Sequence, residues 1–190
     1  MVSLTETQES ILDAVQSVIV RDGVASASMR QVAATADVSL GLLSYHFDDK
    51  DSLIAAAFER ATDALFDASV KAAQASDDPS ERVTMFLRGS FTPKFLDGDY
   101  LRLRIALWTV AVTDPGLAKI DARFFDKYRR ALVGLLGEAL PELGSRELRD
   151  RVTDVISFSN GLWLDWARFG ETDDLQRGLQ RCEAIALSHT

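Results

Sequence analysis

Apolar residues recur every three or four positions along most of the chain, which is the pattern of helices with one buried face. Near the N-terminus, Ile11, Val15 and Ile19 belong to such a stripe. The stripe ends at Gly23, and glycine at this place suits the left-handed cap that closes many helices. The pattern therefore predicts a helix over residues 5–21.

Two short helices are expected next. Ser28 and Ser39 are suitable N-caps, because a serine hydroxyl accepts a hydrogen bond from a free amide of the first helical turn. They predict helices over 29–36 and 40–46, joined by a tight turn at Asp37. Two short helices joined in this way form a helix-turn-helix.

The rest of the chain also has helical spacing and no strand-like alternation. Helices are expected over 49–75, 80–95, 100–112, 114–140, 145–169 and 173–187. Pro93 would kink the second of these or end it early, because proline lacks the amide hydrogen that a helix interior uses. The sequence therefore predicts an all-α protein of about nine helices.

The segment from Ile11 to Ile54 carries a specific resemblance. It reads ILDAVQSVIVRDGVASASMRQVAATADVSLGLLSYHFDDKDSLI, and it is similar to the DNA-binding domain of the TetR family. The order of the helices matches, and so does a signature formed by Tyr45, His46, Phe47, Lys50 and Leu53. The resemblance implies a helix-turn-helix domain over residues 1–48.

The second half resembles a narrower subgroup, the repressors of betaine synthesis and their relatives, called BetI-type. Two segments carry the likeness, LRLRIALWTVAVTDPGLAKI around Trp108 and NGLWLDWARFGE around Trp163. The resemblance implies a helical ligand-binding and dimerisation domain over residues 49–190. It also implies a ligand-responsive repressor that a small-molecule effector, not yet identified, releases from a palindromic double-stranded DNA operator.

The family motif suggests which residues meet DNA. Tyr45, His46 and Lys50 match positions that contact phosphates, and Arg30 matches a position that reaches guanine in some relatives. The full expected set is Ser28, Arg30, Ser39, Leu40, Gly41, Leu43, Ser44, Tyr45, His46 and Lys50. His46, Lys50 and Arg30 each have a plain structural alternative, as a core histidine, a solvated lysine and a surface ion pair respectively.

Three further points concern the same motif. Leu40 and Leu43 either touch thymine methyl groups or pack, whereas Leu42 and Phe47 are expected to face the domain core. Many relatives have glycine at Asp37, but aspartate tolerates the left-handed backbone region, so the turn should persist. Many relatives have tyrosine at Ser44, so a phosphate contact there would be shorter or absent.

The charge balance argues against general affinity for DNA. The chain has a formal net charge of −8, and its first 50 residues alone carry three basic and seven acidic side chains. Affinity for DNA comes largely from cations that meet phosphates. We therefore expect binding that depends on a particular operator. An interaction or ligand-binding protein that kept the fold and lost DNA binding is the alternative.

Aromatic side chains in the second half are candidates for the effector site. The expected set is Phe86, Trp108, Phe124, Asn160, Trp163, Asp165 and Trp166. Tryptophan faces attract cations, which suggests a quaternary ammonium or polyamine ligand, and the family resemblance points loosely to choline. The alternative is that the tryptophans belong to the core or to a dimer interface.

The last two expected helices are candidates for a homodimer interface. Val152, Val155 and Ile156 begin an apolar stripe on the first, and Leu179 and Ala186 belong to a stripe on the second. Cys182 lies on the second stripe and is expected to be a small buried hydrophobe. Pairing with a second copy would form a four-helix bundle around a two-fold axis.

Other classes of protein find little support in the sequence. The chain lacks the GxSxG, HExxH, phosphate-loop and CxxC motifs, and its two histidines are His46 and His189. We expect no catalytic residues, no metal and no cofactor. The N-terminus lacks the features of a signal peptide, and no run of 18 apolar residues exists. A cytoplasmic protein without membrane contact is therefore expected.

Overall fold

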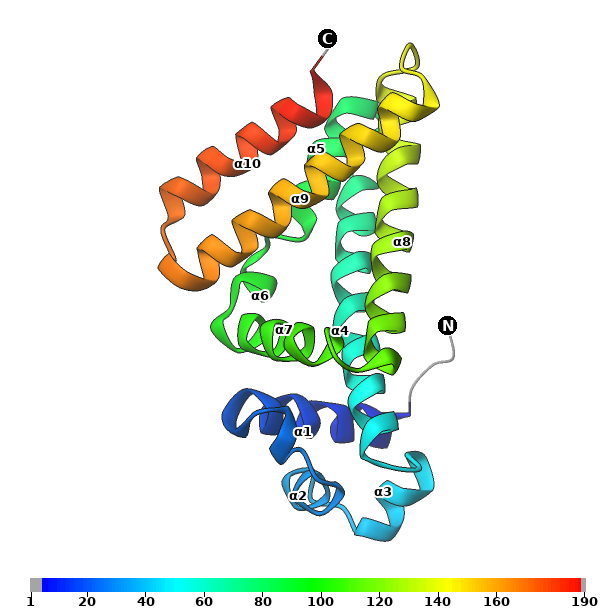
Figure 1. The fold of residues 1–190 in the computed structure, drawn as a ribbon, viewed down its shortest axis with the longest axis vertical. Helices are drawn as coiled ribbons and strands as arrows, with labels where there is room; N and C mark the ends of the chain where they lie inside the picture. The colour runs from blue at the N-terminus through cyan, green and yellow to red at the C-terminus, as the bar shows by residue number, and fades with distance from the viewer. Residues whose placement is uncertain (1–4, 189–190) are drawn as a thin grey trace. The chain divides into compact units, whose positions relative to one another are not determined.

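The computed structural model describes residues 5–188, so His189 lies outside the described residues. Figure 1 shows a chain of helices joined by short connections, and no strand occurs within residues 5–188. The α-helices are labelled α1 to α10, and α6 is a single turn of four residues. The expected all-α fold of about nine helices is confirmed.

The chain forms two compact units. The first contains the described residues up to Asp63 together with Asp99–Ala122, and the second contains Ala64–Gly98 together with the described residues from Arg123 onward. Helices α4 and α8 each contribute to both units. These units are defined by contacts, so they do not test the expected boundary at residue 48 between the DNA-binding and ligand-binding domains. The functional boundary stays a prediction.

The first unit holds the N-terminal helices and the two segments that pack on them. Its elements are α1 (Glu6–Asp22), the 3-10 turn η1 (Val24–Ser26), α2 (Met29–Thr35), α3 (Leu40–His46), the first part of α4 (Lys50–Ala73), most of α7 (Gly98–Ala111) and the start of α8 (Pro115–Ala139). Ile11, Val15 and Ile19 are buried in its core as the sequence pattern predicts. This core fixes the helix-turn-helix against α4.

Polar contacts join the helices of the first unit. The guanidinium of Arg60 on α4 pairs with Asp13 on α1 at 2.7 Å and donates to the carbonyl of Glu9 at 3.1 Å. The hydroxyl of Tyr100 on α7 donates to the carbonyl of Ala61 on α4 at 3.0 Å. These bonds hold α1 and α7 to the same helix, α4, which begins directly after the helix-turn-helix.

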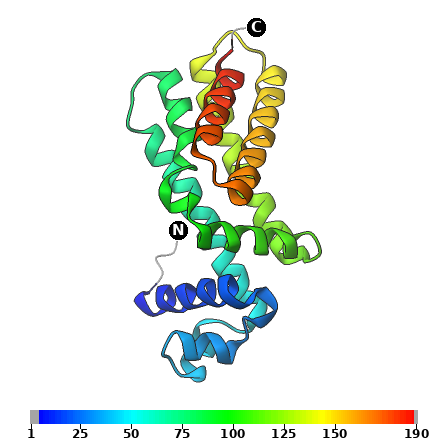
Figure 2. The same ribbon diagram turned by 90° about the vertical axis from the view of Figure 1, so that its left-hand side faces the viewer.

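The second unit is a helical bundle. It contains the rest of α4 and α8 with α5 (Pro79–Gly89), α6 (Pro93–Leu96), α9 (Ser145–Phe169) and α10 (Thr172–Leu187). Helices α9 and α10 pack side by side, as Figure 2 also shows. Gly170 ends α9 with φ of +64°, the left-handed geometry that glycine adopts without steric cost. The thiol of Cys182 is buried between these helices, beside the hydroxyl of Ser159 at 3.4 Å.

The helix expected over 80–95 ends early, as the presence of Pro93 predicted, because α5 ends at Gly89 and a separate turn begins at Pro93. The residue before a proline avoids the helical region, so the break falls upstream of Pro93. Gly89 also lies very close to α4, where a Cβ atom would sit 2.6 Å from the Cα of Ser69. This close approach of two backbones needs a glycine.

Aromatic rings and hydroxyls fill the centre of the second unit. The centroid of the Phe86 ring lies 4.7 Å from that of Tyr128 and 6.4 Å from that of Phe66. The hydroxyls of Tyr128 and Ser90 lie 3.3 Å apart. Burial raises the pKa of Tyr128 to about 12, because a phenolate would lose its hydration there.

Candidate functional site

The turn between α2 and α3 has the geometry that the sequence predicts. The hydroxyl of Ser28 accepts from the amide of Gln31 at 3.3 Å, and that of Ser39 accepts from the amide of Leu42 at 3.1 Å. Asp37 has φ of +53°, which lies in the left-handed region. The expectation that aspartate keeps this turn without glycine is therefore confirmed. The two caps and the turn fix the direction in which α3 leaves α2.

Helix α3 presents a buried face and an exposed face. Leu43 is 0% exposed and Phe47 is also buried, because residues four apart lie on the same side of a helix. The expected base contact of Leu43 is therefore wrong, and its alternative, packing, holds. Leu42 was expected in the core with Phe47, but it is 40% exposed because it lies about 100° around the helix from Leu43.

The outward face of α3 carries most of the remaining DNA-binding candidates. Ser39, Leu40, Gly41, Ser44 and Tyr45 are all exposed. Tyr45 is 83% exposed, and its ring meets the half-buried ring of His46 edge-on with centroids 5.1 Å apart. Small residues at the start of the helix and a projecting hydroxyl near its end suit a helix that enters a groove and touches the backbone beside it.

Ser28 and Arg30 are exposed at the start of α2. The serine hydroxyl is used as the N-cap, whereas the guanidinium of Arg30 is available to a base or a phosphate. Its ordinary alternative, a surface ion pair, is not among the ion pairs of the described residues. The position therefore stays a candidate for a DNA contact.

Lys50 begins α4 and is half-buried. Its Nζ atom donates a hydrogen bond to the carbonyl oxygen of Ala25 at 2.7 Å. Nothing in the spacing of the sequence indicates this bond, because its partner is a backbone atom of η1. The ammonium group keeps two further protons, so the bond orients Lys50 without removing its capacity to meet a phosphate.

Acidic side chains surround the start of α4. The carboxylate of Asp49 accepts from the amide of Ser52 at 2.7 Å, and this hydrogen bonding lowers the pKa of Asp49. Asp48 and Asp51 are exposed beside it. Three carboxylates close to one lysine reduce the local positive potential, which agrees with the expectation of weak general affinity for DNA.

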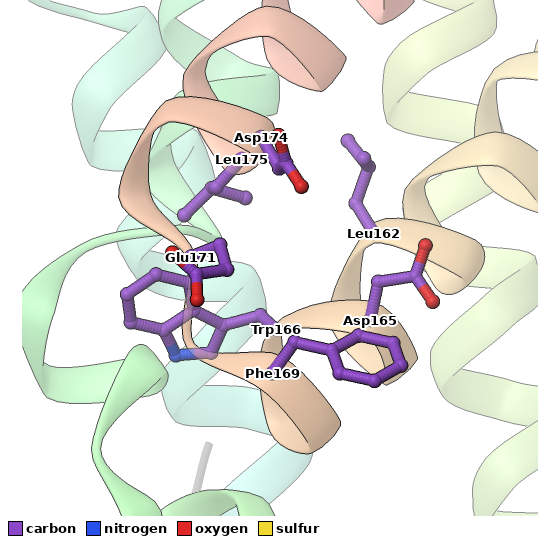
Figure 3. Close-up of a pocket in the computed structure, with 7 residues that line it drawn as sticks. All are labelled: Leu162, Asp165, Trp166, Phe169, Glu171, Asp174 and Leu175. Atoms are coloured by element: carbon purple, nitrogen blue, oxygen red, sulfur yellow. The ribbon is translucent and has the colours of Figure 1, made fainter.

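A cavity of about 170 Å³ lies where α9 ends and α10 begins. Figure 3 shows its lining side chains, which are Leu162, Asp165, Trp166, Phe169, Glu171, Asp174 and Leu175. Asp165 and Trp166 belong to the expected effector set, and the other five were missed. Leu162, Trp166 and Phe169 are spaced by four and three residues, so their common side of α9 could be seen in the sequence. The packing of α10 over this end of α9 could not.

Specific contacts hold several of these side chains in place. The indole Nε1 of Trp166 donates to the carbonyl of Leu96 at 2.9 Å, which fixes the orientation of the ring. The guanidinium of Arg168 lies 4.6 Å from the centre of the Phe169 ring. Asp174 pairs with Arg177 on the same helix. Asp165 and Glu171 add two exposed carboxylates near the aromatic rings.

The structure does not bring the other effector candidates to this cavity. Phe86 and Phe124 pack in the core of the second unit around Tyr128. Trp163 packs against Phe91 with ring centroids 5.5 Å apart. Asn160 is half-buried on α9. Phe86, Phe124 and Trp163 therefore have packing roles, and the expected effector contacts of all four residues stay predictions.

Trp108 belongs to the first unit, unlike the other six effector candidates. Its Nε1 donates to Asp121 at 3.2 Å, and the guanidinium of the buried Arg104 stacks 4.8 Å from the ring centre. Burial raises the pKa of Asp121, and the nearby positive charge of Arg104 opposes part of that shift. The cation that this tryptophan meets is a side chain of the protein.

The apolar stripes expected to face a partner are buried within one chain. Val152, Val155 and Ile156 on α9 and Leu179 and Ala186 on α10 are all less than 9% exposed. They pack between α9, α10 and α5, so a single chain already satisfies them. These side chains are therefore used in packing within one chain, and the expectation of a homodimer through the last two helices stays a prediction.

Two properties of the described residues bear on other functions. None of the helices within residues 5–188 combines the length and the apolarity that crossing a membrane requires. In the same part of the chain, no three or more histidine, cysteine, aspartate or glutamate side chains are grouped so that they would hold a metal ion.

Comparison with known proteins places the chain in a family. Residues 11–57 match the model of the bacterial regulatory proteins of the tetR family, and residues 79–189 match that of the BetI-type transcriptional repressor C-terminal domain. The chain is 25% identical to the HTH-type transcriptional regulator BetI of Paraburkholderia phytofirmans, over 90% of this chain and 86% of that protein.

Solved structures share the fold of this chain. A transcriptional regulator from Pseudomonas aeruginosa PAO1 superposes with a TM-score of 0.86 at 26% identity, over 94% of this chain and 87% of that one. A regulator from Saccharomonospora viridis, solved in complex with choline, has a TM-score of 0.79 at 17% identity over 96% of both chains. The chain belongs to the TetR family, with a C-terminal domain of the BetI type, and is a ligand-responsive DNA-binding regulator of transcription.

Proposed function

We propose that the protein is a cytoplasmic, homodimeric repressor that a small organic cation releases from a palindromic operator. The observation that carries the DNA part is the exposed face of α3, which bears Ser39, Gly41, Ser44 and Tyr45 and is oriented by two serine caps. Tyr45 and Lys50 would anchor the phosphates on either side of the groove.

A two-fold dimer would double the phosphate contacts, which are few in a single acidic DNA-binding domain. Two recognition helices about 34–36 Å apart would meet two half-sites of the operator, and each phosphate contact would occur twice. The outward face of α9 offers an interface, since Ser157, Gly161, Leu164 and Arg168 recur at helical spacing and are exposed. Leu164 is 46% exposed and would be the apolar centre of that contact.

The cavity at the junction of α9 and α10 supports a cationic effector. Its volume of about 170 Å³ is below the range of drug-sized ligand sites, which favours a small molecule. The Trp166 ring offers a π face, and Asp165 and Glu171 offer negative charge beside it. Aromatic rings combined with carboxylates are how proteins recognise quaternary ammonium groups. The choline bound in the Saccharomonospora viridis relative agrees with this chemistry.

Release from DNA would follow from a shift between two states of the dimer. A ligand changes such an equilibrium only if it binds one state more tightly than the other. A cation held at the start of α10 would favour one arrangement of α9 and α10, and with it one spacing of the two recognition helices. The proposal therefore predicts that effector and operator weaken each other's binding to the same extent.

The first experiment is a mobility shift with the DNA that flanks the gene for this protein, over a series of salt concentrations. A saturable, salt-sensitive shift at a short inverted repeat is expected. If a folded dimer gives no shift even at low salt, the repressor proposal fails. The carboxylates of Asp48, Asp49 and Asp51 would then favour an interaction protein that has lost DNA binding.

The effector is tested with choline and its neutral isostere, 3,3-dimethylbutan-1-ol, by calorimetry. Choline is expected to bind and the alcohol is not, because the two differ only in charge. Glu171→Gln should weaken choline binding, whereas Asp173→Asn should not, since Asp173 is an exposed acid on the same turn that does not line the cavity. Equal effects of the two substitutions would place the ligand elsewhere.

A further inference from the structure

A second and larger cavity lies in the first unit, close to the helix-turn-helix. Its volume is about 460 Å³. Three segments form its walls: Val24 and Ala25 of η1, the first turns of α4, and the junction of α7 with α8. Val24, Ile54, Ala55, Val110 and Leu117 make most of this lining apolar. The volume lies within the range of small-molecule sites.

One cation lines this cavity, and it is Lys50. The lysine is half-buried, and among the described residues its hydrogen-bond partner is the neutral carbonyl of Ala25, at 2.7 Å. A partly buried ammonium whose partner is uncharged attracts an anion more strongly than a fully solvated one does. The cavity therefore presents a positive group at the edge of an apolar surface.

Two carboxylates, Asp51 and Asp114, also line the cavity. Each lies at the beginning of a long helix, where the helix dipole favours negative charge. The carboxylate of Asp114 caps α8 by accepting from the amide of Leu117 at 2.8 Å. Asp51 is exposed in the first turn of α4. The hydrogen bond from Leu117 and the helix dipole stabilise the carboxylate of Asp114, and the helix dipole stabilises that of Asp51. The two further protons of the Lys50 ammonium remain able to meet an anion.

We propose that this cavity binds a small organic anion with an apolar tail, of the alkyl or aryl carboxylate class. The carboxylate accepts from the Nζ atom of Lys50, and the tail lies against Val110, Ile54 and Leu117. The bound anion neutralises a side chain proposed to contact a phosphate of the operator. The cavity thus gives the protein a second input, separate from the cation cavity between α9 and α10.

Calorimetry with three ligands that share a ten-carbon chain tests the charge preference. Decanoate, decanol and decyltrimethylammonium differ in their head groups alone. Decanoate is expected to bind about tenfold or more tightly than either of the others, since it alone can form a hydrogen-bonded ion pair with Lys50. Equal affinities, or tightest binding by the ammonium compound, would overturn the proposal.

Two substitutions locate the site. Ala55→Phe fills the cavity with a ring and is expected to abolish decanoate binding, and Lys50→Met is expected to weaken it about tenfold or more while keeping the apolar wall. Trp166→Ala in the other cavity serves as the control and should leave the affinity for decanoate unchanged. Val110→Phe repeats the filling test from α7 if circular dichroism shows that Ala55→Phe fails to fold.

The functional consequence has its own readout. Decanoate should weaken operator binding by the wild-type protein and leave operator binding by Ala55→Phe unaffected, while choline should still release both proteins. Decanoate binding that survives in both cavity-filling variants would overturn this proposal without touching the cation site. If choline fails to release the protein from DNA while decanoate still acts, the proposed cationic effector is overturned and the proposed anion site is not.

Discussion

The ammonium of Lys50 is bonded to the carbonyl oxygen of Ala25 at 2.7 Å, so the first residue of α4 is tied to the connection between α1 and α2. A lysine at a helix start is usually a freely moving surface group. Here the bond restricts the side chain before DNA arrives, which lowers the conformational entropy that a phosphate contact would cost.

Replacing Lys50 by methionine should weaken operator binding at all sequences alike. It should also reduce the salt dependence by about one unit per half-site, because one phosphate contact is lost from each. Mobility shifts from low to high salt measure both quantities. Lys71→Met is the control, since Lys71 is an exposed lysine later on α4. An unchanged salt slope in Lys50→Met would remove Lys50 from the DNA interface.

Gly89→Ala should destabilise the protein by about 1–3 kcal/mol, because the added methyl group would meet the backbone of α4 at Ser69. Gly134→Ala is the matched control. Gly134 lies within α8 with open space around its Cα, so alanine should stabilise the protein there by about 0.5–1 kcal/mol. Urea unfolding measures both. Equal effects of the two changes would refute the close approach of α5 to α4.

Alkaline pH should destabilise the protein through Tyr128. Its pKa is about 12 in the folded state, whereas an unfolded tyrosine ionises near 10. The stability that depends on the protonated hydroxyl is therefore complete below pH 10 and is lost as the pH rises toward 12. Tyr128→Phe should show a smaller fall in the free energy of unfolding over this interval.

Denaturant unfolding at pH 8 and pH 11 checks this difference. Tyr45→Phe, which removes the hydroxyl of an exposed tyrosine, should follow the wild-type pH dependence. Tyr100 accounts for part of the fall in every variant, because burial raises its pKa as well. If Tyr128→Phe loses as much stability between pH 8 and pH 11 as the wild type does, the buried hydroxyl of Tyr128 does not cause the alkaline destabilisation.

Leu164→Asp should break the proposed dimer, because it places a charge at the centre of an apolar contact on the outward face of α9. Sedimentation velocity measures the change from dimer to monomer. Val112→Asp is the control, since Val112 is an exposed apolar residue at the end of α7. A dimer that persists in Leu164→Asp but not in Val112→Asp would move the interface to α7.

Local signals predicted the helix-turn-helix well. Serine caps and a left-handed aspartate act within a few residues, so Ser28, Asp37 and Ser39 could be assigned from their neighbours alone. The phase of α3 was harder to assign. With leucines at both 42 and 43, only the register with Phe47 decides which of them is buried.

The effector cavity shows where sequence reasoning loses its basis. Trp163 and Trp166 are both effector candidates in the sequence, but Trp163 packs against Phe91 and Trp166 lines the cavity. Glu171 lines the same cavity as Trp166 only because α10 folds back over the end of α9. Similarly, the break at Gly89 depends on its distance from Ser69, twenty positions earlier, which no local pattern records.

Cys182 has a practical consequence for measuring motion in this protein. It is the single cysteine of the chain, it is 1% exposed, and burial raises the pKa of its thiol. Because the thiolate is the form that reacts with maleimides, the native residue should label slowly. A cysteine introduced at the exposed Ser44 would therefore carry a spin label or fluorophore with little background. In a dimer, one substitution would give a pair of labels whose separation reports the distance between the two recognition helices.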